Sequence, residues 1–303
     1  MKPEPKNIPA SVRTRLLNLS RDRQEDFNLT LIRYVSERFL YRLGKSSCRK
    51  EYVLKGAMLL TFSLGQFHYR PTRDVDLLRT GIQDEESIRA DLDTICSIDE
   101  GSDGVLYDVS RARLEEIREN NRYQGMRIRM PVQLGNARIT LQIDLGFGDA
   151  VHPNPQSITL KPLLDQGMPE VLAYPLEVVV AEKFETILSI GMITSRMKDF
   201  FDLYALATGH QFDRTRLHRS IKATFERRNT ELPTELPTML GEGLLQDSTK
   251  QTQWTAFIRR IDRDPAELHL ALVLEKIRGF LRIVWDQAFA GSVSTWTPQD
   301  GWH

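Results

Sequence analysis

Two aspartates stand two residues apart in the stretch RPTRDVDLL, at positions 74 and 76. They alternate with the apolar residues Val75 and Leu77, a pattern typical of a half-buried strand on which residues i and i+2 face the same side. Two carboxylates about 4–6 Å apart repel each other unless a cation compensates their charge. Mg²⁺ or Mn²⁺, which take hard oxygen ligands, would supply that charge. The spacing therefore indicates a metal-binding pair at Asp74 and Asp76.

A third carboxylate, Asp144, occurs in the stretch ARITLQIDLGF between Ile143 and Leu145. It is an isolated acid in an otherwise apolar strand pattern, so it is the candidate third ligand. Two divalent ions about 3.5–4 Å apart can clamp an in-line displacement at phosphorus. The residues together suggest phosphoryl-transfer chemistry.

The same acids also have a purely structural interpretation. Asp74 could cap a strand end and Asp144 could satisfy a buried backbone group. Asp76 could pair with Arg73 or Arg79. The order of elements along the chain favours chemistry through a resemblance. A strand and a glycine turn that opens a helix, EYVLKGAMLLTFSL, precede the aspartate pair, and a lone acid follows on a later strand. This order resembles the sequence layout of the DNA polymerase β nucleotidyltransferase superfamily. Backbone N–H groups at such a helix start can bind nucleotide phosphates.

The elements that must position these residues predict an α+β fold. Helical periodicity covers about 10–45, and strand patterns follow in VLYDVSRARLEEI, GMRIRMPVQL and ARITLQIDLGF. The prolines of HPNPQ, with Pro162 and Pro169, indicate a connection of exposed turns and extended chain. We expect a mixed β-sheet with flanking helices over 1–170, an α-helical bundle domain over 171–290 and a flexible tail over 291–303.

Five blocks resemble, in the same order, the motifs of the AbiEii/AbiGii nucleotidyltransferase toxins: LKGAMLL, RPTRDVDLL, IDLGFGDAVHP, YPLEVVVAEKFETIL and SRMKDFFDLYAL. That family includes the mycobacterial MenT toxins and belongs to the DNA polymerase β nucleotidyltransferase superfamily. The resemblance covers roughly 28–210. It implies a nucleotidyltransferase fold and a metal-dependent transfer of NMP from an NTP.

By matched position, the resemblance implies a phosphate-binding turn at Lys55, Gly56 and Ala57, a Ser/Thr position at Thr72, the metal pair at Asp74 and Asp76, nucleotide contact at Lys183, and a closing acidic block at Asp199 and Asp202. Ala57 replaces the Gly or Ser usual in the family, so its backbone can contact phosphate but a side-chain hydroxyl is missing. Spacing does not decide between Asp199 and Asp202 as the catalytic acid. Taken alone, Lys183 could extend its ammonium to water, and the two acids could lie on a solvated helix face with ion pairs.

The resemblance also implies a function: a toxin of a toxin–antitoxin system that adds a nucleotide to the 3′ end of tRNA and so blocks translation and growth. MenT toxins add pyrimidine nucleotides whereas AbiEii is described as preferring GTP, and we favour CTP. An antitoxin from an adjacent gene is the implied partner. The alternatives are an enzyme that transfers NMP to a protein hydroxyl, including its own Thr72, and a catalytically inactive fold that serves as a binding module.

The 41 basic and 41 acidic residues cancel, so the net charge gives no support for an RNA acceptor. The distribution of the basic residues along the chain does support one. Three basic groups could contact phosphates: the N-terminal segment; Arg111, Arg113, Arg118, Arg122, Arg127, Arg129 and Arg138; and Arg214, Arg216, Arg219, Lys222, Arg227 and Arg228. Each arginine could instead be solvated or paired. Two cysteines without ligand spacing and the lack of a long apolar run favour a cytoplasmic protein with no membrane partner, which we expect to be a monomer.

Overall fold

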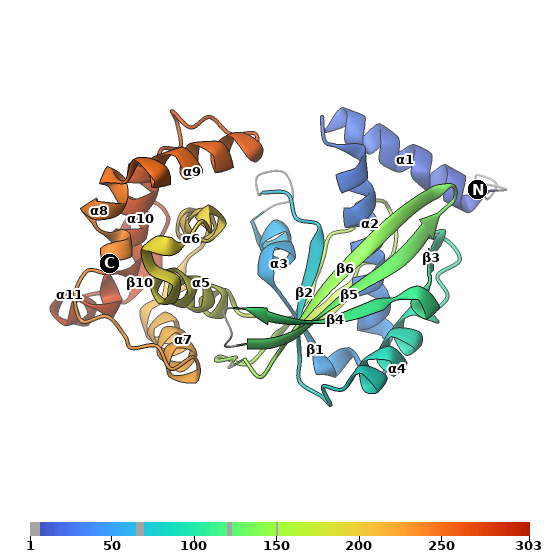
Figure 1. Ribbon diagram of the computed structural model, residues 1–303, viewed down its shortest axis with the longest axis horizontal. Helices are drawn as coiled ribbons and strands as arrows, with labels where there is room; N and C mark the ends of the chain where they lie inside the picture. Colours follow the sequence, from blue (N-terminus) through green and yellow to red (C-terminus); the bar gives the residue numbers. More distant parts are fainter. Residues whose placement is uncertain (1–6, 65–69, 120–122, 150) are drawn as a thin grey trace. The chain divides into compact units, whose positions relative to one another are not determined.

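The computed structural model of the chain describes residues 7–64, 70–119, 123–149 and 151–303 (Figure 1). Its contacts divide the chain into two compact units. Unit 1 comprises Met1–Ser63, Pro71–Gly148 and Gln156–Ala173, and unit 2 comprises Leu64–Arg70, Asp149–Pro155 and Tyr174–His303. Unit 1 contains a mixed sheet and unit 2 is mainly helical, so the expected α+β class is confirmed.

The strands of unit 1 are β1 (Tyr52–Lys55), β2 (Asp74–Arg79), β3 (Val105–Tyr107), β4 (Arg113–Glu119), β5 (Tyr123–Leu134), β6 (Ala137–Phe147), β7 (Gln156–Thr159) and β8 (Glu170–Ala173). They form one sheet in the order β3-β5-β6-β2-β1-β8-β7, with β4 also pairing with β5. Strand β2 lies between β1, to which it is antiparallel, and β6, to which it is parallel. The two strands that carry the candidate metal ligands are therefore neighbours.

The pattern of β2 sets which residues face the core. Val75 and Leu77 are almost fully buried, whereas Asp74 and Asp76 are half-buried. Since side chains alternate across a strand, the two aspartates share the face opposite these apolar residues. The expected strand and its alternation are both present.

The helices of unit 1 are α1 (Ile8–Asp22), α2 (Phe27–Lys45), α3 (Gly56–Ser63) and α4 (Glu85–Cys96), with short 3-10 helices η1 (Arg49–Glu51) and η2 (Val109–Arg111). Helix α2 starts at the N-cap Asp26, whose carboxylate accepts a hydrogen bond from the Leu29 N–H. Its apolar positions, including Val35, Phe39 and Leu43, are buried, and it packs against β6 and β8. The helical periodicity of the sequence was therefore correct here.

The segment expected to be only turns and extended chain contributes two strands. β7 pairs with β8 in antiparallel fashion, and β8 pairs in parallel with β1, Val53 opposite Leu172. Both strands are four residues long, and Pro162 and Pro169 lie between them. Strands this short among prolines give little periodicity in the sequence, and the pairing of β8 with the distant β1 leaves no local signal.

The helices of unit 2 are α5 (Leu176–Ile190), α6 (Met197–Gly209), α7 (Arg214–Arg227), α8 (Glu242–Gln246), α9 (Ser248–Arg260), α10 (Leu270–Leu281) and α11 (Gln287–Gly291), with 3-10 helices η3 (Gly191–Ile193), η4 (Thr238–Leu240) and η5 (Arg282–Val284). Helix α5 packs against α6 and α7, and the rings of Phe184 and Phe225 lie 5.4 Å apart at the α5–α7 contact. Within the described ranges, no helix has both the length and the apolar character needed to span a membrane.

The end of the chain, where the sequence predicted a flexible tail over 291–303, contains two short strands. Strands β9 (Phe212–Asp213), β10 (Thr295–Thr297) and β11 (Gly301–Trp302) form a small antiparallel sheet. Trp296 is buried and its indole N–H donates a hydrogen bond to the Ala207 carbonyl. Trp302 stacks on Phe280. Burial of Trp296 and the stacking of Trp302 on Phe280 hold a segment whose Gly, Ser and Thr content resembles a loop.

Candidate functional site

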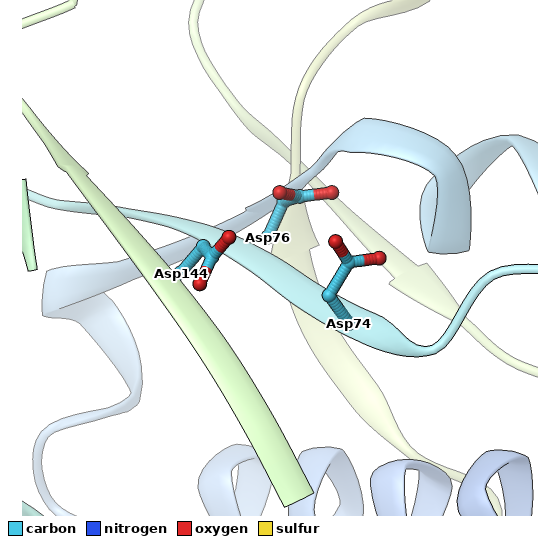
Figure 2. Close-up of side chains that lie close together, drawn as sticks. All are labelled: Asp74, Asp76 and Asp144. Carbon is cyan, nitrogen blue, oxygen red and sulfur yellow. The ribbon is translucent and has the colours of Figure 1, made fainter. Parts of the chain in front are cut away.

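Three aspartates converge on one face of the unit 1 sheet (Figure 2). In the parallel pairing of β2 with β6, Asp76 lies opposite Asp144 and Asp74 lies opposite Gln142. One carboxylate oxygen from each of the three acids lies within 4.8 Å of the others, and all three side chains are half-buried. The register thus brings together the acids whose convergence the sequence suggested.

This triad fits a divalent cation of the Mg²⁺ type. Such an ion takes oxygen ligands at about 2.0–2.1 Å in octahedral geometry, so neighbouring ligands lie about 3 Å apart and opposite ligands about 4 Å apart. The observed spacing of the carboxylate oxygens, within 4.8 Å, needs only a small closure to reach these values. The donors are all hard oxygens, as Mg²⁺ and Mn²⁺ prefer.

Gly56 supports Asp76 from the turn between β1 and α3. Its φ is +69°, in the region that glycine adopts without steric cost. A Cβ at this position would lie 2.7 Å from the Cβ of Asp76 and would also collide with its carboxylate. Lys55 lies opposite Asp76 in the β1–β2 pairing. The expected phosphate-binding turn therefore lies directly beside a triad carboxylate, and helix α3 starts at that point.

Thr72 holds Asp74 from within unit 1. Its hydroxyl donates a hydrogen bond of 2.7 Å to Oδ1 of Asp74, and the residue is 6% exposed. A buried donor of this kind fixes the rotamer of a carboxylate and leaves its second oxygen for a ligand. The structure thus gives Thr72 a contact beyond that of a turn residue.

Arg127 on β5 contacts the triad, and sequence reasoning did not single it out for this site. Its Nε lies 2.8 Å from Oδ1 of Asp144, and its Nη2 lies 2.6 Å from Oδ2. The hydrogen bond to Asp144 raises the pKa of the Arg127 guanidinium, against the opposing effect of burial. A sequence signal existed: the turn at Gly135 pairs Leu134 with Ala137, and that register places Arg127 opposite Asp144.

A second charged cluster lies in unit 2, where Lys183 of α5 meets Asp199 and Asp202 of α6. The Lys183 ammonium lies 3.1 Å from Oδ1 of Asp199 and also contacts Oδ2 of Asp202. The residues Asp199 and Asp202 are only 2% and 0% exposed. Lys183 therefore does not extend its ammonium to water, and Asp199 and Asp202 do not lie on a solvated helix face. These were the two structural interpretations that the sequence left open.

Two arginines complete this cluster. Arg196 places its Nε 2.8 Å from Oδ2 of Asp199. Arg70 forms a bidentate pair with Asp202, with Nε to Oδ1 at 2.8 Å and Nη2 to Oδ2 at 3.0 Å. Sequence reasoning missed Arg70, because 132 residues separate it from Asp202 and no local pattern connects them.

The charges of the cluster stabilise one another. Burial by itself lowers the pKa of Lys183, but Asp202 and Asp199 outweigh it and the pKa is raised. Burial by itself raises the pKa of Asp202, but Lys183 and Arg70 outweigh it and hold the pKa well below its usual range. Both side chains are therefore charged at neutral pH, as a lysine assigned to triphosphate binding must be.

Several arginines expected to contact RNA form ion pairs with acids of the same chain, most of them at the surface. Besides Arg127, the ion pairs are Arg111 with Asp108, Arg129 with Glu115, Arg216 with Glu177, and Arg228 with Asp149, Glu182 and Glu185. Arg122 and the side chain of Arg118 lie outside the described residues. The basic groups therefore support an RNA surface less strongly than the sequence suggested. Arg228 forms three ion pairs and is largely buried, so it is no longer a candidate for RNA contact.

A family model described as "Nucleotidyl transferase AbiEii toxin, Type IV TA system" matches residues 38–289. No curated protein sequence matches. Among solved structures, a putative nucleotidyltransferase from H. pylori is similar over 82% of this chain and 93% of its own, with 14% identity and a TM-score of 0.47. JHP933 from Helicobacter pylori is similar over 85% and 91%, with 11% identity and a TM-score of 0.46.

Proposed function

Because the chain belongs to the AbiEii family of nucleotidyl transferase toxins of type IV toxin–antitoxin systems, we propose that it transfers NMP from an NTP to the 3′ end of tRNA. The modified tRNA would lose its function in translation, and growth would stop. The observation that carries the chemistry is the convergence of Asp74, Asp76 and Asp144 beside the Gly56 turn. Membership of a toxin–antitoxin family also implies a cognate antitoxin.

In this reaction the 3′-hydroxyl oxygen attacks the α-phosphorus of the NTP, the bond to the bridging oxygen breaks, and pyrophosphate leaves. Divalent cations bound by the triad would lower the pKa of the attacking hydroxyl and neutralise charge on the leaving group. The protein's own part is to fix three carboxylates, of which Asp74 is held by Thr72 and Asp144 by Arg127. A triad carboxylate would accept the hydroxyl proton.

The triphosphate contacts are proposed from the turn and from Lys183. Backbone N–H groups at the start of α3, including that of Ala57, can donate to phosphate oxygens, and the helix dipole favours an anion there. Lys55 would add charge at the same turn. The resemblance assigns Lys183 to the triphosphate, and its raised pKa keeps its ammonium charged. Asp199 and Asp202 would orient that ammonium.

A labelling experiment tests the proposal. Purified protein is incubated with total tRNA, Mg²⁺ and one of four α-labelled NTPs at a time, and we expect label on RNA, strongest with CTP. Asp74→Ala and Lys183→Ala should abolish both RNA labelling and growth inhibition in a bacterial host at equal expression and unchanged circular dichroism. If both variants stay fully toxic, the proposed active site is wrong.

One observation favours a second candidate, transfer of NMP to a protein hydroxyl. The Thr72 oxygen lies 2.7 Å from a triad carboxylate, so an acceptor hydroxyl is already present beside the proposed metal site. The same labelling reactions separate the candidates, since label confined to protein supports this one. Thr72→Val should then remove the label, whereas Thr72→Ser should keep it.

A further inference from the structure

A single guanidinium occupies both oxygens of one triad acid. Arg127 and Asp144 face each other across the antiparallel pair β5–β6, and their two hydrogen bonds measure 2.8 and 2.6 Å. This fork geometry is the strongest form of an arginine–carboxylate pair. The Arg127 side chain is 31% exposed and that of Asp144 is 15% exposed, so the guanidinium has a path to solvent.

The same carboxylate faces two competing demands. A cation at the triad needs an oxygen of Asp144, yet Arg127 already binds both oxygens and brings a positive charge to the same place. Like charges a few ångströms apart disfavour each other at the moderate dielectric of a half-buried site. In exchange, Arg127 relieves the repulsion among three converging carboxylates when no cation is bound.

We propose that Arg127 is a displaceable counter-ion of the triad: it holds and neutralises Asp144 before the metal binds, and it yields an Asp144 oxygen when the divalent cation arrives. This inference rests on the metal site of the proposed function. It makes Arg127 a positioning residue whose charge lowers the affinity of the empty site for metal. A guanidinium that merely oriented Asp144 as a ligand would have the opposite effect, because its loss would weaken metal binding.

The chain contains a matched control two residues along the same strand. Arg129 lies opposite Gln142 in the β5–β6 pairing, so it shares the sheet face of Arg127. It pairs with Glu115 at 2.6 Å and is 39% exposed. Arg129→Gln therefore removes the same charge from the same strand without touching a triad carboxylate.

The test is a titration of the full-length chain with Mn²⁺ in the absence of nucleotide. The electron paramagnetic resonance signal of the free ion is recorded at each step and gives the affinity for Mn²⁺. We expect Arg127→Gln to bind Mn²⁺ about tenfold more tightly than the wild type, and Arg129→Gln to bind about as the wild type does. Asp76→Asn should lose the site. Circular dichroism confirms that each variant is folded.

The outcomes separate the two proposals. If Asp76→Asn loses Mn²⁺ but Arg127→Gln binds it equally or more weakly, the counter-ion role is wrong and the metal site stands. If the wild type binds no Mn²⁺, or Asp76→Asn binds it normally, the metal site fails and the counter-ion role fails with it.

A measurement on the wild-type chain covers the case in which Arg127→Gln does not fold. The Nε–H of Arg127, assigned by its loss in Arg127→Lys, should be protected from solvent exchange in the metal-free protein because it donates to Asp144. Addition of Mg²⁺ should remove that protection. A resonance that stays protected at saturating Mg²⁺ would overturn the proposed displacement.

Discussion

At the scale of single residues, Gly56 is the position where the backbone and the triad constrain each other most. We predict that Gly56→Ala destabilises the protein by about 2–4 kcal/mol, because alanine pays for a positive φ and its Cβ collides with Asp76. The collision also displaces the Asp76 carboxylate from the triad. The rate of nucleotide transfer should therefore fall even at temperatures where the variant is still folded. Thermal unfolding and RNA labelling measure the two effects.

Gly243→Ala is the control for this prediction, since a Cβ at that position meets nothing within 4 Å and alanine favours a helix such as α8. We expect it to retain stability and transfer activity. If Gly56→Ala unfolds at the same temperature as the wild type and retains full transfer activity, the turn is not constrained by its φ and by Asp76.

Single residues also show what the sequence could specify. The alternation around Asp74 and Asp76 predicted their common face, and the lone acid Asp144 was found because the strand around it is apolar. Arg127 was predictable in principle, because a two-residue turn fixes the hairpin register. Arg70 was not, because only tertiary folding brings it to Asp202.

At the scale of elements, Arg228 at the C-terminal end of α7 links that helix to α5. It lies 2.8 Å from Glu185 and 3.3 Å from Glu182, both on α5, and 3.7 Å from Asp149. Burial by itself lowers its pKa, but these acids, Glu182 first, outweigh it and the pKa is raised. The side chain is 11% exposed, so the pairs are poorly screened by solvent.

We predict that Arg228→Gln lowers the free energy of unfolding of unit 2 by about 3–5 kcal/mol, because it removes a poorly solvated cation that Glu185, Glu182 and Asp149 share. Urea denaturation followed by tryptophan fluorescence measures it, since all four tryptophans lie in unit 2. Lys222→Gln on the same helix, 57% exposed with its ion pair at 3.8 Å, should change little. Equal stability of the two variants would contradict the prediction.

Elements were predictable from the sequence where their own periodicity carried the signal. The buried stripe of α2 and the alternation of β2 are of this kind. Strands β8 and β10 are not, because each is four residues or fewer. Each also pairs on one side with a strand far along the chain, β8 with β1 and β10 with β9. Trp296 gives β10 its burial, but one tryptophan in a polar tail has no periodicity to reveal it.

At the scale of the whole molecule, stability depends on pH through Glu37, a buried carboxyl on α2. Its Oε2 accepts a 2.6 Å hydrogen bond from the Leu163 N–H, which lies between β7 and β8, and its Oε1 pairs with Arg38 at 2.8 Å. Burial raises its pKa to about 7, although Arg38 and the Leu163 N–H act in the opposite direction. The carboxyl joins segments more than a hundred residues apart.

The sign of the pH effect follows from this raised pKa. Between about pH 4.5 and pH 7 the folded chain retains a proton on Glu37 that the unfolded chain has released, so the contribution of Glu37 to stability falls as pH rises through that window and changes no further above it. The fall is about 3 kcal/mol, from about 1.4 kcal/mol per pKa unit. Glu37→Gln cannot titrate, so its free energy of unfolding, relative to that of the wild type, should increase between pH 5 and pH 8. Urea denaturation followed by far-ultraviolet circular dichroism, which detects both units, measures this difference. A profile for Glu37→Gln that stays parallel to that of the wild type would mean that this carboxyl is already ionised in the folded protein at pH 5.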